Sequence, residues 1–365
     1  MRGTPDPQTN MLCLISPESF VPAAHPIRRI KTLVEPMLLE LKDLFDEMYA
    51  AGGRPSIPPE RLLKSKLLIA LYSVRSERLF CEQLGYNFLF RWFLDMDLNE
   101  PAFDHSVFSK NQERIMKHSA ARVFFAKVFE SAREKGWTSD EHFCVDGTLI
   151  ESLASLKSFA PKDQPKASGD EDKGNPSVDF KGQRRRNDTH QSTTDPESRL
   201  YKKGAGKEAK LCFAAHALME NRNGLIGELK VTSPTEVTES RAAVEILQEV
   251  GQTQEIQPST VAGDKGYHNS EFVTGCRAEG IAPHISQIEG RKVEGLDGRT
   301  TRTEGYKQST RCRKKIEEVF GWMKTIGGLR KSRYKGIART QVCAYWVGAA
   351  YNLLRMANLM VLPTG

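Results

Sequence analysis

The hydrophobic periodicity of the chain changes near residue 136, and this change constrains the fold more than any other feature. Before it, apolar residues recur at the three-to-four-residue spacing of amphipathic helices. After it, short apolar runs bounded by turn residues alternate with helical patterns. We therefore predict a helical region over residues 1–135, an α/β region over 136–340 and a C-terminal helix within 341–365.

In the helical region, the apolar spacing and the capping residues predict a series of helices. The aromatic residues between 80 and 93 recur at helical spacing, so we interpret them as core. Residues 98–116 fit either a helix-turn-helix DNA reader or an ordinary helical bundle, and the pattern does not decide between them. The predicted helices cover residues 36–49, 61–74, 76–94, 104–116 and 120–135.

In the α/β region, the predicted order is one strand, a strand hairpin, a helix, a strand, a helix, a strand and a final helix. This order gives a mixed sheet with helices on its faces, the ribonuclease H-like arrangement. A polar insert over residues 153–209 interrupts it and is predicted to be a loop or partly disordered. The predicted strands are 142–150, 210–218, 225–232, 260–263 and 281–285, and the predicted helices are 236–249, 270–279 and 311–326.

Charge is concentrated in one segment. The chain has a net charge of +7, yet residues 299–339 contain thirteen Lys or Arg and only three acidic residues. A polyanion is the natural partner of such a surface, although a solvated basic face has the same composition. The seven scattered cysteines contain no Cys-x-x-Cys pair, and no apolar signal segment follows Met1. We expect a cytoplasmic protein without a membrane partner, and residues 342–362 to form a buried helix.

Three carboxylates follow apolar strands or lie on a helix. Asp146 ends the strand Phe-Cys-Val, Asp264 ends Val-Ala-Gly, and Glu317 lies on the last helix of the α/β region. In the predicted sheet the two strands are neighbours, so the aspartates come together and the helix can add the glutamate. Glu317 lies on one helical stripe with Arg313 and Lys324, whereas Glu318 is turned away from that stripe. Carboxylate oxygens are ligands that Mg²⁺ prefers.

These blocks resemble bacterial insertion-sequence transposases of the DDE type, specifically the insertion-sequence-five group. The resemblance rests on Phe-Cys-Val-Asp146-Gly-Thr, on Val-Ala-Gly-Asp264-Lys-Gly-Tyr, and on a spaced signature of tyrosine, arginine, glutamate and lysine. Arg313, Glu317 and Lys324 match that signature, while Thr310 replaces the tyrosine. The segments Arg-Pro-Ser-Ile-Pro-Pro-Glu60 and Phe103-Asp-His-Ser-Val-Phe-Ser extend the resemblance into the helical region.

The resemblance implies a DNA transposase. Asp146, Asp264 and Glu317 would be both catalytic residues and ligands of two Mg²⁺ ions, which Mn²⁺ can replace. The enzyme would cut at the terminal inverted repeats of its element and join the 3′ ends to target DNA. It would bind double-stranded DNA as a homodimer or higher oligomer, with the helical region serving DNA binding or dimerisation. The DNA-contact candidates are Arg313, Lys324, Lys265, Tyr267, Arg330, Lys331 and Arg333.

Two other functions remain compatible with the sequence. A transposase-derived protein that binds DNA without cutting it would keep the basic segment but need no carboxylates. A nuclease of the same fold would cut DNA without joining ends. The histidines and cysteines lack the paired spacing of a zinc motif, and no Gly-x-x-x-x-Gly-Lys-Ser/Thr loop is present, which disfavours ATP hydrolysis.

Overall fold

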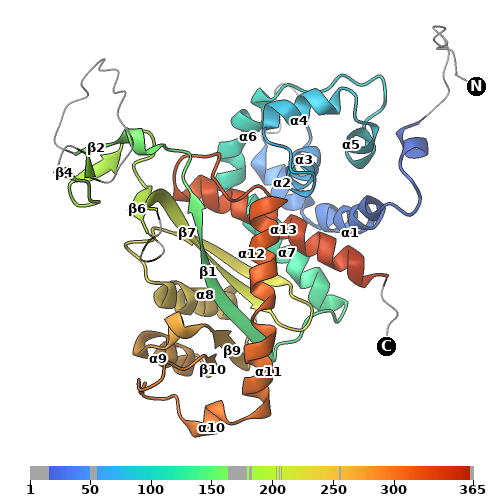
Figure 1. The fold of residues 1–365 in the computed structure, drawn as a ribbon. Helices are drawn as coiled ribbons and strands as arrows, with labels where there is room; N and C mark the ends of the chain where they lie inside the picture. Colours follow the sequence, from blue (N-terminus) through green and yellow to red (C-terminus); the bar gives the residue numbers. More distant parts are fainter. Residues whose placement is uncertain are drawn as a thin grey trace, which may run out of the picture.

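A computed structural model describes residues 16–49, 56–162, 179–180, 183–202, 204, 206, 208–254 and 256–361. Parts of the predicted polar insert and the first fifteen and last four residues lie outside this range. Within it, a mixed sheet is joined to an N-terminal group of helices (Figure 1). None of the helices in the described part of the chain combines the length and apolar character needed to cross a bilayer.

The central sheet has the order β10-β9-β1-β7, and two further strands pair with the remaining edge of β7. β1 runs antiparallel to β7 and parallel to β9, which is itself parallel to β10. The sheet is therefore mixed, as the sequence predicted. Its strands are β1 (His142–Glu151), β6 (Arg199–Tyr201), β7 (Lys210–Glu220), β8 (Ile226–Thr232), β9 (Thr260–Gly263) and β10 (Ala282–Ile285).

Helices cover both faces of this sheet. Successive residues of a strand point to opposite faces, so neighbouring residues of β8 contact different helices. On β8, Leu229 packs towards the long helix α13 (Ile337–Leu359), while Lys230 pairs with Glu245 of α8 (Glu239–Thr253). α9 (Ser270–Ala278) packs beside α8 and β10. α7 (Ala120–Glu134) and α12 (Lys315–Thr325) join α13 on the other face.

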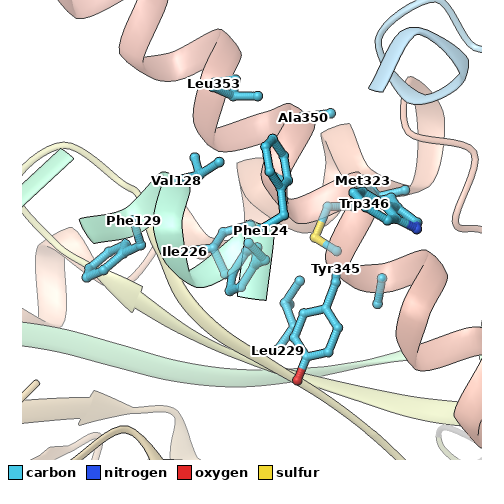
Figure 2. Close-up of a cluster of buried hydrophobic side chains, with 14 of the residues drawn as sticks. Phe124, Val128, Phe129, Ile226, Leu229, Met323, Tyr345, Trp346, Ala350 and Leu353 are labelled. Carbon is cyan, nitrogen blue, oxygen red and sulfur yellow. The ribbon is translucent and has the colours of Figure 1, made fainter. Parts of the chain in front are cut away.

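The main core lies where α7, α12 and α13 meet β8 (Figure 2). Phe124 and Val128 of α7 face Trp346 and Leu353 of α13 across this core, and all four side chains are buried. Burying an aromatic or leucine side chain contributes about 1.5–3 kcal/mol. α13 thus contacts both the sheet and the N-terminal helices, so one core joins the two regions.

The helical region differs in detail from the prediction. The predicted helix over 76–94 is two helices, because Ser76 and Asn87 each cap a new one by accepting a backbone N–H bond. The predicted helix over 36–49 is also two, and the first begins ten residues earlier, at Pro26. The elements are α1 (Pro26–Glu40), α2 (Lys42–Met48), α3 (Pro59–Leu71), α4 (Glu77–Leu84), α5 (Phe88–Phe93) and α6 (Ser106–Lys117).

The structure favours the bundle over the helix-turn-helix reading of residues 98–116. Residues 94–105 separate α5 from α6, whereas the turn of a helix-turn-helix takes about 3–4 residues. Asn111 of α6 is buried and accepts a hydrogen bond from Tyr49 Oη at 3.0 Å. Its side chain is therefore part of the packing between helices.

The described part of the insert is more ordered than the predicted loop. β2 (Phe159–Pro161) pairs with β5 (His190–Ser192) after the short helix η2 (Leu156–Ser158), and β6 joins the central sheet. A two-residue pair, β3 (Asp179–Phe180) with β4 (Gln183–Arg184), also lies in it. Phe159 is buried against Ala154 and Leu211 in a small separate apolar cluster. This cluster provides the core that the polar composition did not predict.

The basic segment 299–339 begins with helical structure that the sequence did not predict. α10 (Gly298–Thr301) and α11 (Glu304–Cys312) precede α12, which begins at Lys315 and not at 311 as predicted. α11 and α12 follow one another along β1 (Figure 1). The final helix α13 begins at Ile337, within the segment that we had assigned to the α/β region.

Candidate active site on β1 and after β9

The parallel pairing of β1 and β9 brings Asp146 and Asp264 side by side. The register joins Phe143 to Val261 and Cys144 to Ala262. Continued by two residues, it sets Asp146 level with Asp264. Because neighbouring strands lie about 4.8 Å apart, the two aspartates are then neighbours across the β1–β9 pair.

Each aspartate is oriented by the backbone that follows it. Asp146 Oδ1 accepts a hydrogen bond from the backbone N–H of Gly147 at 2.7 Å. Asp264 Oδ1 accepts one from the backbone N–H of Gly266 at the same distance, and caps the short helix η3 (Lys265–Tyr267). Both aspartates are partly buried, so each carboxylate has a defined orientation and remains accessible from outside.

Helix α12 contacts the same face of β1. Lys324 Nζ donates a hydrogen bond to Thr148 Oγ1 at 2.6 Å, and Thr148 shares a strand face with Asp146. Glu317 is seven residues before Lys324, so it lies on the same helical stripe, and it is exposed. The charge of Glu318 instead acts on Tyr351 of α13, where it contributes to a raised pKa of that hydroxyl.

Arg313 lies just before α12 and close to Cys144. Burial and the charge of Asp146 raise the pKa of the Cys144 thiol, and the Arg313 guanidinium opposes this rise. Its Nε is buried and has no hydrogen-bond partner among the described residues. Arg313 therefore adds positive charge beside the strand that carries Asp146.

Glu317 is not brought into a finished ligand set with the two aspartates. Among the described residues, no group of three or more His, Cys, Asp or Glu side chains converges as a metal site. Asp146 and Asp264 are thus neighbours, and α12 packs on the same face of β1. Glu317 lies in the first turn of that helix and does not complete a ligand set with the two aspartates.

Two family comparisons agree with this arrangement. Residues 137–353 match the family described as "Transposase DDE domain", and residues 15–114 match "Transposase domain (DUF772)". The first match covers more than half of the chain. The chain belongs to the DDE transposase domain family. No significant match was found among curated proteins or among solved structures.

Burial of Tyr267 does not favour the DNA contact that the sequence analysis assigned to this residue. The residue has an exposed fraction of 0%, and its ring packs beneath Gly263 and against Phe272. The short helix η3 turns it inward, so Tyr267 is not a surface DNA contact. Its neighbour Lys265 is exposed, in agreement with a side chain that can meet a ligand from solvent.

The other predicted DNA contacts of the transposase follow α12. Arg330 and Lys331 are exposed, and their segment runs beside the end of β1: the Arg330 carbonyl accepts from the Glu151 N–H at 3.0 Å. Arg333 is also exposed but donates from Nη1 to the Val74 carbonyl at 2.8 Å. Arg333 therefore also holds the helical region against the transposase domain.

Sequence reasoning missed Glu239, the first residue of α8. A β-carbon placed on Gly147 would lie 3.1 Å from Glu239 Oε1, and one placed on Gly266 would lie 3.7 Å from Glu239 Oε2. An acidic residue is common in the first turn of a helix, because its negative charge interacts favourably with the positive N-terminal end of the helix dipole. Glu239 therefore did not stand out in the sequence. The sequence offered one signal for this approach: a glycine follows each aspartate closely, Gly147 after Asp146 and Gly266 after Asp264.

Proposed function

We propose that this protein is a divalent-metal-dependent DNA transposase of the insertion-sequence-five group. It would cut DNA at the terminal inverted repeats of an insertion sequence and join the resulting 3′ ends to a target. The observation that carries the proposal is the DDE-domain match across 137–353, with Asp146 on β1 and Asp264 directly after β9, the strand that runs parallel beside it. The three sequence blocks support the narrower group, and the sheet order supports a ribonuclease H-like domain.

The donor chemistry of Asp146 on β1 and Asp264 after β9 fits a hard divalent cation. Asp146 and Asp264 supply adjacent carboxylates, each held by one backbone N–H bond. In this proposal they hold Mg²⁺ or Mn²⁺ together with Glu317, which a side-chain or helix adjustment would bring in. When bound, such ions supply activation of the attacking oxygen and charge stabilisation at the phosphate.

The basic residues would position the DNA. Lys324 already reaches the strand face of Asp146, and Arg313 lies beside Cys144 on that face. Arg330 and Lys331 extend the positive surface past the end of β1. These side chains would hold phosphates near the two aspartates, and Lys265 would contact DNA from the other strand end. Acting on two element ends favours a homodimer or higher oligomer.

The test is a cleavage and strand-transfer assay on DNA bearing the inverted repeats that flank the gene. Asp146→Asn and Asp264→Asn should each lower both activities by at least about 10³-fold, because the loss of a carboxylate removes charge where the reaction develops it. Both variants should keep wild-type affinity for the DNA ends. Asp140→Asn is the matched control, since it lies exposed near the opposite end of β1.

Full activity of Asp146→Asn would refute the proposal. DNA binding without any cleavage by the wild-type protein, with Mg²⁺ or Mn²⁺ present, would identify a catalytically silent binding protein. Cleavage without joined products would identify a nuclease. Chelation of the metal should abolish cleavage while end binding persists.

A further inference from the structure

Glu239 approaches the two glycines that orient the catalytic aspartates. Gly147 donates its N–H to Asp146, and Glu239 Oε1 lies 3.1 Å from the β-carbon position of this glycine. Gly266 donates its N–H to Asp264, and its β-carbon position lies 3.0 Å from Asp264 Oδ1 and 3.7 Å from Glu239 Oε2. The missing side chains at both glycines leave the space that the Glu239 carboxylate occupies.

The short length of β9 opens this approach. Among the described residues, the pairing of β9 with β1 ends at Ala262, opposite Cys144, so β9 does not cover β1 between Asp146 and the bridge of Glu151 to Lys331. α8 begins next to this gap, where Thr238 caps it by accepting the Arg241 N–H. The cap fixes the first turn, and with it the backbone of Glu239.

Two buried polar atoms point into the same place. The Tyr267 hydroxyl is buried and has no hydrogen-bond partner among the described residues. Burial raises the pKa of this hydroxyl, and the charges of Glu239, Asp146 and Asp264 raise it further. His216 is 1% exposed, and its Nδ1, also unpartnered in the described structure, lies 3.3 Å from the same β-carbon position of Gly147.

The site is open to solvent on the α8 side. A surface hollow of about 570 Å³ is lined by His216, Glu239, Gly266 and Glu271 together with neighbouring residues. Glu239 itself is exposed, so its carboxylate can meet an ion from solution. Carboxylate oxygens of this kind are the hard ligands that a divalent cation prefers.

We propose that Glu239 is an additional acidic residue of the catalytic centre, which binds the divalent cation together with Asp146 and Asp264. It reaches the site from α8, on the side opposite to α12. Among the described residues the three carboxylates do not yet converge on one point, so metal binding would draw in the flexible Glu239 side chain by a rotation. This role is separate from that of Glu317 and rests on the proposed function.

The test compares Glu239→Gln with wild type by titrating the full-length protein with Mn²⁺ in a calorimeter, without DNA. Glutamine keeps the size of the side chain and removes its charge. The affinity for Mn²⁺ should fall at least about tenfold, as expected when a metal site loses a supporting group. Glu236→Gln is the matched control: Glu236 is exposed three residues earlier and pairs with Arg199, so its Mn²⁺ affinity should equal that of wild type.

A second variant leaves all the acids in place. In Gly147→Ala the new β-carbon would crowd Glu239 Oε1 and push it away, so Mn²⁺ binding should weaken although no charge is lost. In a third experiment, Fe²⁺ replaces Mn²⁺, and ascorbate with peroxide generates radicals that cut the nearby backbone. Cuts should map to the segments around residues 146, 239 and 264.

The outcomes separate this inference from the proposed function. Wild-type Mn²⁺ affinity in Glu239→Gln, or iron-mediated cuts near 146 and 264 but not near 239, would overturn the role of Glu239 and leave the transposase proposal standing. If Asp146→Asn also bound Mn²⁺ like wild type, the metal centre itself would be refuted. Thermal unfolding of each variant establishes that the folded proteins are compared.

Discussion

Buried ionisable residues give this protein a stability that depends on pH, and Glu228 on β8 is the clearest case. It is 1% exposed, and burial raises the pKa of its carboxyl to about 7. Its oxygens accept from the Leu229 N–H at 2.8 Å and from Gln254 Nε2 at 3.1 Å. Arg122 favours the charged form, while Glu249 opposes it.

The raised pKa predicts the sign of the effect of Glu228→Gln. Between the ordinary value of 4.5 and about 7, the folded protein keeps a proton that the unfolded chain releases, so stability falls as pH rises through this window. Glutamine mimics the protonated form and does not titrate. The free energy of unfolding of Glu228→Gln, relative to that of wild type, should therefore increase by on the order of 3 kcal/mol as pH rises across that window.

Urea unfolding of both proteins over a pH series measures this difference. His216 and His284, whose pKa values burial lowers to about 4, shift stability in the opposite direction, since the unfolded chain binds their protons first. They are present in both proteins and cancel in the comparison. A difference that does not change with pH would contradict the prediction.

At the level of residues, the aspartates were predictable and their surroundings were not. Asp146 and Asp264 end apolar runs, and a parallel register follows from the strand order. Glu239 precedes Asp264 by a whole helix and a strand, so only the folded chain brings it close. Tyr267 looked like a surface residue because it adjoins Lys265, but the turn of η3 buries it.

At the level of elements, the short strands were located well, whereas the boundaries of the N-terminal helices were not. The predicted strand over 260–263 is correct at both ends, and the hairpin of β7 and β8 was recognised from its turn, in which Gly224 has φ +71°. α11 was missed because its only buried residue is Ser309, so it has no apolar stripe to detect. A helix or strand that is buried on one face carries apolar residues at regular spacing, and an element without a buried face does not.

Two helix glycines provide a matched test of packing between elements. A β-carbon on Gly348 of α13 would lie 2.6 Å from Leu229 Cδ1 and 2.9 Å from Phe125 Cε2. Gly348→Ala should therefore overpack the core and destabilise the fold by about 1–3 kcal/mol. Gly321 on α12 is exposed and meets nothing within 4 Å, so Gly321→Ala should stabilise by about 0.5–1 kcal/mol.

Chemical denaturation of the two alanine variants measures both values. The opposite signs are the informative result, because the two substitutions add the same methyl group to a helix. Equal effects would mean that α13 can shift away from β8 at no cost.

At the scale of the whole molecule, the two regions are joined by contacts that sequence patterns do not reveal. Arg29 Nε donates to the Ala357 carbonyl at 2.8 Å, and Ser73 Oγ donates to the Ile326 carbonyl at 2.8 Å. Tyr334 Oη donates to Glu77 Oε1 at 2.8 Å, and Lys66 pairs with the same carboxylate. Periodicity reports which face of a helix is buried, but not which partner buries it.

The basic surface predicts how DNA binding responds to salt. Replacing both Arg330 and Lys331 by alanine should weaken binding to inverted-repeat and to unrelated DNA by similar factors. The slope of log affinity against log salt should shrink by about 1–2, since each phosphate contact releases about one counterion. Fluorescence anisotropy with labelled duplexes over a range of salt measures both quantities.

Lys42→Ala serves as the control for this experiment, because its ammonium lies 2.5 Å from the Asp46 carboxylate on α2. Its slope should match that of wild type. An unchanged slope in the double variant would place the DNA elsewhere on the molecule.

Strand β6, which belongs to the insert over 153–209, determines whether one edge of the sheet can pair with another molecule. β8 leaves the first residues of β7 uncovered, and β6 of the insert pairs with Leu211 and Cys212 at that point. Without β6, apolar residues at the edge of β7 would offer unpaired N–H and C=O groups to a strand of another molecule. Strand β6 therefore supplies the partner for this part of β7, and its removal would leave the backbone of residues 210–212 open to pairing with a strand of another copy.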